Sequence, residues 1–163
     1  MGHLFHVPGS AGESGAEARV RVVIQRVSEA RVRVGGRIRG EVGRGLLALV
    51  AFAPDDRDPT LEWMADKLWG LRVFPDDEGR MDRSLSDVGG ELLLVSQFTL
   101  YGDASRGRRP SFTGAAAPAD ARRLYDRFVE LCRRGGPVSE GEFGARMEVE
   151  LVNDGPVTLQ LER

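Results

Sequence analysis

The alternation of hydrophobic and polar residues predicts strands at both ends of the chain. Apolar side chains at every second position are typical of strands with one buried face. A glycine pair at Gly35-Gly36 supplies the positive φ angles of a tight hairpin turn. Residues 46–52 are continuously apolar, which predicts a central strand covered on both faces. The alternating stretches are residues 20–25, 31–34, 37–42, 146–151 and 157–161.

Two stretches instead follow the spacing of an amphipathic helix. In the first, Asp58 is the predicted N-cap and Pro59 the first helical residue, followed by an apolar stripe that includes Leu61 and Leu68. A short strand is expected over residues 71–74. The second helix is predicted over residues 118–134, before two glycines and a proline. This order predicts one α+β domain, residues 20–163, with mixed or antiparallel barrel-like sheets and two main helices packed on the outside.

Residues 92–101 have the most unusual pattern of the chain. They begin as a buried apolar strand, but Ser96, Gln97 and Thr99 then introduce polar side chains without a turn residue. Continued alternation would place Gln97 and Thr99 on the same face. Polar groups in a buried strand need hydrogen-bond partners, either from neighbouring strands or because the strand end lines a pocket. The basic loop that follows favours a pocket.

The first 19 residues have no hydrophobic period and lack the features of a signal peptide. They are expected to be a disordered extension or the product of a start codon assigned too early. Both histidines of the chain, His3 and His6, lie there, so the predicted domain contains none. Its chemistry must therefore work without an imidazole.

Composition excludes several classes of function. With Cys132 as the only cysteine, neither an intramolecular disulfide nor a His/Cys metal site is expected. Cys132 falls on the apolar stripe of the second helix and is expected to be a core residue. No nucleotide-binding glycine motif is present, so no cofactor is predicted. No apolar run is long enough to span a membrane, and a net charge of −2 argues against coating nucleic acid by bulk charge. A reducing, cytoplasmic location is expected.

Three groups of residues carry candidate chemistry. Thr99 offers a hydroxyl without an evident base, and the Phe98 and Thr99 amides are candidates for stabilising an oxyanion. Arg106, Arg108 and Arg109 form a basic loop that either contacts a phosphate backbone or is simply solvated. Phe143 is a candidate for stacking on a base, although a core position is the plainer interpretation.

Residues 153–158 form another constellation, Asn-Asp-Gly-Pro-Val-Thr. A proline between two strand patterns cannot donate to a ladder, so the plain interpretation is a turn. A cis Gly155-Pro156 bond would instead present backbone carbonyls in a fixed direction. Spacing alone leaves both interpretations open.

Together these motifs resemble the D-aminoacyl-tRNA deacylases of the bacterial and eukaryotic type, the D-tyrosyl-tRNA deacylase family. Residues 96–101 (SQFTLY) resemble its first active-site motif and residues 153–158 (NDGPVT) its second. Residues 87–92 and 108–112 resemble further signatures, so the likeness extends from Val20 to the C-terminus. Val20 stands where family members have their initiating methionine. We therefore expect Val20 to be the true start, encoded by GTG.

The resemblance implies a homodimer that hydrolyses the ester of D-aminoacyl-tRNA, with each active site shared between subunits. It also implies that glycyl-tRNA is a further candidate substrate and that DNA and membranes are not partners. Thr99 would lie at the scissile ester, and substrate-assisted hydrolysis by the ribose 2′-hydroxyl competes with covalent catalysis by Thr99. The implied catalytic segment is Ser96, Gln97, Phe98 and Thr99.

The resemblance also implies that Gly155-Pro156 is cis and reaches into the partner subunit's site, where it excludes L-amino acids by steric fit. Val157 is a further implied substrate contact, and Arg26 helps to hold the Gly-Pro segment. The remaining implied contacts are Phe143 and Met147 at the adenosine, and Arg106, Arg108 and Arg109 at tRNA phosphates.

Two other functions compete with this one. A non-catalytic RNA-binding module would keep the basic loop, but it has no need for both active-site motifs. A deacylase of free D-amino-acid esters would leave the basic loop and the missing base unexplained. Salt-dependent tRNA binding separates a deacylase of free esters from the D-aminoacyl-tRNA deacylase.

Overall fold

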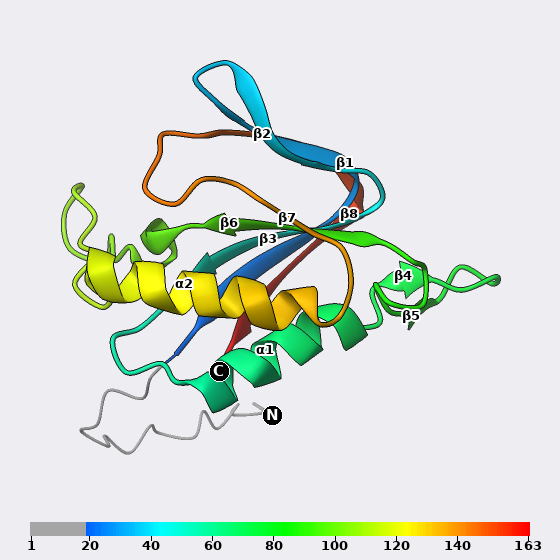
Figure 1. Cartoon of the computed structure of the whole chain (residues 1–163), viewed down its shortest axis with the longest axis horizontal. Coiled ribbons are helices and arrows are strands. Elements are labelled where there is room, and N and C mark those ends of the chain that lie inside the picture. Colours follow the sequence, from blue (N-terminus) through cyan, green and yellow to red (C-terminus); the bar gives the residue numbers. More distant parts are fainter. Residues whose placement is uncertain (1–18) are drawn as a thin grey trace, which may run out of the picture.

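A computed structural model describes residues 19–163, so the predicted N-terminal extension, apart from Arg19, lies outside the described residues. One sheet and two helices dominate the fold (Figure 1). The main sheet contains β1 (Arg21–Val34), β2 (Arg37–Val42), β3 (Gly45–Ala51), β6 (Glu91–Ser96), β7 (Val138–Glu140) and β8 (Glu148–Glu162). The other elements are α1 (Asp58–Gly70), the hairpin β4 (Phe74–Pro75) and β5 (Met81–Arg83), the 3₁₀ helix η1 (Phe98–Tyr101) and α2 (Pro118–Arg133).

The main sheet is mixed and nearly closes on itself. Its strands follow the order β2-β1-β3-β6-β7, and β8 pairs with β1 outside this path. The pairs β1–β2, β1–β3 and β1–β8 are antiparallel, whereas β3–β6 and β6–β7 are parallel. The hydroxyl of Ser139 in β7 donates to the Glu41 carbonyl of β2 at 3.2 Å, which brings the two ends of the path together. The predicted barrel-like α+β fold is confirmed.

Apolar residues fill both faces of the central strands. Leu46 and Leu94 belong to the core cluster beneath α1 and α2, whereas Leu47 and Leu93 belong to a second cluster on the opposite face. Burial of each such side chain stabilises the fold by about 1.5–3 kcal/mol. This two-sided burial explains why residues 46–52 show no alternation, and it confirms that the helices cover the outer face of the sheet (Figure 1).

The first helix begins one residue earlier than the sequence pattern predicts. Asp58 is its first helical residue rather than its N-cap, and Arg57 precedes it without a side-chain cap. The Asp58 carboxylate instead pairs with Arg127 of α2 at 3.0 Å, so a contact between helices replaces the expected local cap. The strand predicted over residues 71–74 is also reduced, because only Phe74 and Pro75 pair with β5.

The strand predicted over residues 92–101 is wrong beyond Ser96. Pairing with β3 ends at Val50 opposite Ser96, and pairing with β7 ends already at Leu94. Without ladder partners, the chain turns into η1, in which the Leu100 amide donates to the Gln97 carbonyl at 3.1 Å. Gln97 and Thr99 therefore lie in a tight turn and not on one face of a strand.

The two last predicted strands are one strand, β8, with a large bulge. Val27 of β1 pairs with Asn153 and Gln25 pairs with Thr158, so two steps along β1 match five along β8. The surplus residues include Gly155 and Pro156, whose peptide bond is cis. The alternative of a turn between two separate strands is therefore wrong, because β1 continues opposite both halves of β8.

Asp56 is a buried carboxylate that should make stability depend on pH. It is 4% exposed; Oδ2 accepts from the Ala53 amide at 2.7 Å, but Oδ1 has no partner among residues 19–163. Burial raises its pKa to about 6, against the opposing effect of the Ala53 and Val20 amides. The folded state thus keeps a proton that the unfolded state releases near its ordinary pKa, and stability falls as pH rises from about 4 to 6.

Replacing this residue, Asp56→Asn, should remove that dependence. Relative to the wild type, the free energy of unfolding of the variant is expected to rise by about 2–3 kcal/mol between pH 4 and pH 7. Urea denaturation at several pH values measures this difference. Glu62→Gln, at an exposed carboxylate of α1 that does not contribute to the Asp56 pKa, is the control and should follow the wild type. Parallel pH profiles for wild type and Asp56→Asn would contradict the prediction.

Candidate active site

A cavity of about 720 Å³ lies where β6 ends, between η1, the start of α2 and the segment that leads into β8. Five of the predicted site residues line it: Ser96, Gln97, Phe98, Phe143 and Met147. Thr99 follows directly on these residues but does not line the cavity. The structure therefore brings the start of the first motif together with residues 143–147, which lie more than 40 positions later in the sequence.

The cavity walls are rich in aromatic and small apolar side chains. Phe98 is 56% exposed and contacts Phe112 edge to face, with 5.1 Å between ring centroids. On another wall, Phe143 lies 5.8 Å from the ring of the buried Tyr125. Exposed and half-buried aromatic rings around a concave, mostly apolar site are suited to a flat ligand such as a nucleobase.

η1 supplies backbone donors at the edge of this cavity. The Phe98 and Thr99 amides are the first two of the 3₁₀ helix, where the helix itself offers no carbonyl acceptor. The Gln97 side-chain amide donates to the Thr99 hydroxyl. The hydroxyl is thus held by an amide and not by a base. Cys132 is fully buried, and burial raises the pKa of its thiol, which confirms it as a core residue.

Arg26 organises the bulge of β8. It is 9% exposed, its Nε donates to the Asp154 carbonyl at 3.0 Å, and its Nη1 donates to the Val73 carbonyl at 2.6 Å. Arg26 and Val157 are buried, whereas Gly155 and Pro156 are exposed. None of these four residues lines the cavity of the same chain. The residues of the second motif thus lie together around Arg26, but away from the cavity that the first motif lines.

The basic loop begins just after η1 and ends at the cavity. Backbone hydrogen bonds between Asp103 and Ser111, at 2.7 and 2.9 Å, close its base, and Phe112 then lines the cavity. Arg106, Arg108 and Arg109 are exposed, and none forms an ion pair with another described residue. Three uncompensated positive charges thus lie beside the cavity.

Part of the cavity is lined by residues outside the predicted set. Phe112, Ala121 and the small residues that precede α2 all line the cavity, yet none was proposed as a substrate contact. The run of alanines before Pro118 is the sequence feature that could have indicated them, because small side chains leave space for a ligand beside the start of a helix. In residues 19–163 no group of His, Cys, Asp and Glu is arranged to hold a metal ion, and no helix is long and apolar enough to cross a membrane.

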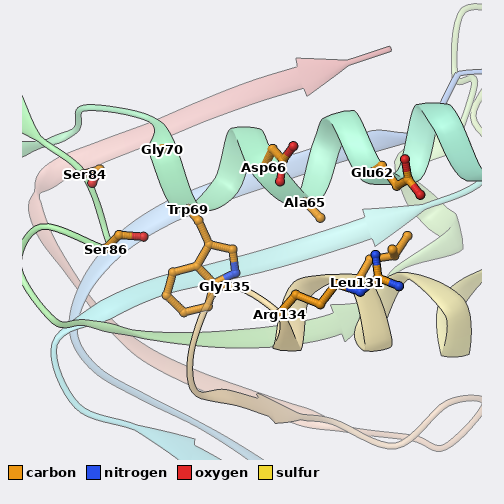
Figure 2. A pocket seen from close by; sticks show the side chains of 10 residues that line it. All are labelled: Glu62, Ala65, Asp66, Trp69, Gly70, Ser84, Ser86, Leu131, Arg134 and Gly135. Atoms are coloured by element: carbon orange, nitrogen blue, oxygen red, sulfur yellow. The ribbon is translucent and has the colours of Figure 1, made fainter.

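A second hollow, of about 530 Å³, lies between α1 and the end of α2 (Figure 2). Trp69 points into it, and its indole Nε1 donates to the Cys132 carbonyl at 2.8 Å, which satisfies a group at the C-terminal end of α2. None of the predicted site residues lies there.

Comparison with known proteins identifies the family. The model of the D-Tyr-tRNA(Tyr) deacylase family matches residues 23–162. A D-aminoacyl-tRNA deacylase of Chlorobaculum parvum is 57% identical over 145 residues, covering 88% of this chain and 97% of the relative.

Two solved structures share the fold. One, titled c-Myc DNA unwinding element binding protein, is 39% identical with a TM-score of 0.82 and covers 86% of this chain and 97% of its own. The other, a probable eukaryotic D-amino acid tRNA deacylase, is 22% identical with a TM-score of 0.77, covering 89% and 100%. The resemblance inferred from the motifs is confirmed, and the chain belongs to the D-Tyr-tRNA(Tyr) deacylase family.

Proposed function

We propose that this protein hydrolyses the ester bond of D-aminoacyl-tRNA in the cytoplasm and releases free D-amino acid and tRNA. The observation that carries the proposal is the cavity in which Phe98 and its neighbours face Phe143 and Met147. An adenosine at the tRNA 3′ end fits its aromatic walls, and the ester would then lie near η1. Family membership supports the same reaction.

In this proposal the substrate supplies the base that the protein lacks. Residues 20–163 contain no histidine, and the only thiol is buried. The ribose 2′-hydroxyl lies beside the ester and activates the attacking water. As the ester carbonyl becomes tetrahedral, its oxygen gains negative charge, which the Phe98 and Thr99 amides stabilise. Gln97 and Ser96 hold the entry to η1, with the Gln97 amide donating to the Val50 carbonyl at 2.8 Å.

The experiment that tests this function measures amino-acid release from D-tyrosyl-tRNA, L-tyrosyl-tRNA and glycyl-tRNA without added metal. Release from the D form but not from the L form supports a chirally selective deacylase. Binding of tRNA without release would support the RNA-binding module instead. Release from both enantiomers would contradict exclusion of L-amino acids by Gly155 and Pro156. Glycyl-tRNA decides whether an achiral substrate is accepted.

Thr99→Ala tests the role of the hydroxyl. Since Thr99 is held by Gln97 and has no adjacent base, we expect a loss in kcat of only about tenfold, the worth of one hydrogen bond. Single-turnover hydrolysis of D-aminoacyl-tRNA measures the chemical step, and Thr99→Ser should restore it. A loss beyond about 10⁴-fold would instead identify Thr99 as a covalent nucleophile.

We further propose that a homodimer completes the site. Gly155 and Pro156 are exposed and lie outside the cavity of their own chain, so they act on the substrate only if a second copy brings them there. Val152 and Leu159 of β8 flank the bulge with 50% and 39% exposure, which provides apolar surface for such contact. Sedimentation of active protein as a monomer would contradict the shared site.

The three loop arginines are proposed to contact tRNA phosphates. Replacing Arg106, Arg108 and Arg109 together by alanine should weaken tRNA binding and lower the slope of log affinity against log salt by about 2–3, because fewer counterions are released. The double variant of Arg80 and Arg83 to alanine removes positive charge at the other end of the molecule (Figure 1) and should keep the slope. An unchanged slope in the triple variant would show that the loop is merely solvated.

The start at Val20 remains a proposal. It rests on the resemblance, since Val20 stands one residue before Arg21 in the position of the initiating methionine. Mass spectrometry of the protein from its native host decides the point. Peptides from residues 1–19 would contradict it.

A further inference from the structure

The position of η1 is not fixed by its own hydrogen bonds or by buried side chains of its own. It contains four residues, none of which is buried. A 3₁₀ helix of this length has few hydrogen bonds of poor geometry and no core side chain to anchor it. Its placement against the cavity must therefore come from contacts made by other elements. One such contact, between Phe98 and Phe112, lies at its first residue.

At the other end of η1, the Tyr101 hydroxyl donates to the Arg19 carbonyl, and Arg21, the first residue of β1, makes further contacts. Its guanidinium carbon lies 4.2 Å from the centroid of the Tyr101 ring, in a cation–π arrangement. Its Nη1 donates to the Leu100 carbonyl at 3.3 Å. Glu162 of β8 forms an ion pair with its Nε at 3.1 Å, although this nitrogen makes no hydrogen bond within residues 19–163. A planar guanidinium makes these three contacts together, which a flexible ammonium does not.

We propose that Arg21 is a positioning residue for catalysis, which fixes the backbone amides of η1 at the substrate ester. It does not line the cavity. Because Leu100 and Tyr101 belong to the same single turn as Phe98 and Thr99, holding the last two residues fixes the orientation of the first two amides. This inference rests on the proposed hydrolysis at η1. It adds a residue outside both active-site motifs.

The test combines kinetics with local hydrogen exchange in the full chain. Arg21→Ala should lower kcat for D-aminoacyl-tRNA by roughly a hundredfold, as expected when catalytic groups shift by about 1 Å. KM should change by less than about threefold, because the cavity walls stay in place. Amide exchange at Leu100 and Gly102, which donate within this turn, should accelerate, while exchange in α2 stays as in the wild type.

Arg21→Lys keeps the charge and the pairing with Glu162 but loses the planar stack, so kcat should fall by about tenfold. If Arg21→Ala does not fold, the kcat and amide exchange of Arg21→Lys test whether Arg21 positions η1. Arg80→Ala removes an exposed, ion-paired arginine from the β4–β5 hairpin and should match the wild type in every readout.

Unchanged kcat in folded Arg21 variants, or faster exchange throughout the chain instead of at η1, would overturn the inference. The two arms also separate it from the proposed function. If the wild type releases no D-amino acid, the proposed function fails, and the exchange arm still shows whether Arg21 holds η1.

Discussion

Replacing Gly155 by alanine is expected to lower kcat/KM for D-aminoacyl-tRNA by roughly a hundredfold, the loss typical of a displaced substrate-positioning group. Gly155 has a φ of +129°, which side chains rarely tolerate. An added Cβ would lie 2.9 Å from Nη2 of Arg26 and 3.0 Å from Cγ2 of Val157. Both neighbours are buried, so neither moves away freely.

Arg26 holds the bulge of β8 through its hydrogen bonds, so the added Cβ should disturb the whole segment. If its guanidinium shifts, the bonds to the Asp154 and Val73 carbonyls weaken together, and the exposed Gly155-Pro156 segment loses its fixed direction. Under the proposed function, discrimination between D- and L-aminoacyl-tRNA should fall as well as the rate. Kinetics with both enantiomers measure the two effects.

A matched control separates this effect from backbone strain alone. Gly79→Ala, in the β4–β5 hairpin, also places alanine at a positive φ of +81°, but its Cβ meets nothing within 4 Å. This variant should lose some stability and keep the wild-type kcat/KM. If Gly155→Ala retains full activity and full discrimination, the bulge of β8 does not act on the substrate.

Gly45→Ala should have the largest effect on folding, a loss of at least about 3 kcal/mol in the free energy of unfolding. Gly45 begins β3 directly beside Glu91 of β6 in the parallel pair. Its Cβ would collide with the Glu91 carbonyl oxygen and lie 2.8 Å from the carbonyl carbon. Since both partners are backbone in the centre of the sheet, the strands would have to separate.

Gly43→Ala is the control for this prediction. It changes a glycine two residues earlier, but its Cβ would meet only the Glu91 carboxylate, at 3.7 Å. Urea denaturation should therefore place Gly43→Ala near the wild type and Gly45→Ala far below it, or show that the latter does not fold. Equal midpoints for the two variants would mean that the β3–β6 pair adjusts to the added carbon.

Local chemistry was sufficient to predict most elements of the fold. The apolar stripe and the terminal glycines locate α2 to within one residue of its end, because both signals depend on neighbours along the chain. Continuous apolarity over residues 46–52 correctly indicates a strand covered on both faces. The start of α1 was missed by one residue, because Asp58 pairs with Arg127 on another helix.

The candidate site was predictable as a set of residue types but not as an arrangement. The absence of histidine and the polar residues after β6 follow from the sequence alone, and they restrict the chemistry. The cavity itself depends on where Phe143 and Phe112 come to lie, and contacts between segments so far apart leave no periodic signal. The alanines before α2 can be interpreted as cavity-lining residues only when the position of the cavity is known.

The sequence by itself determined the family, the order of the main strands and helices and the absence of histidine from residues 20–163. Only the tertiary structure decided that β6 stops at Ser96, that β8 is one bulged strand, and that Asp56 is buried. It also decided that Gly155 and Pro156 lie away from the cavity of their own chain. The physical reason is that a strand ends where its hydrogen-bonding partners end, and burial depends on what packs above a residue. Both are properties of neighbours in space, which periodicity along the chain does not record.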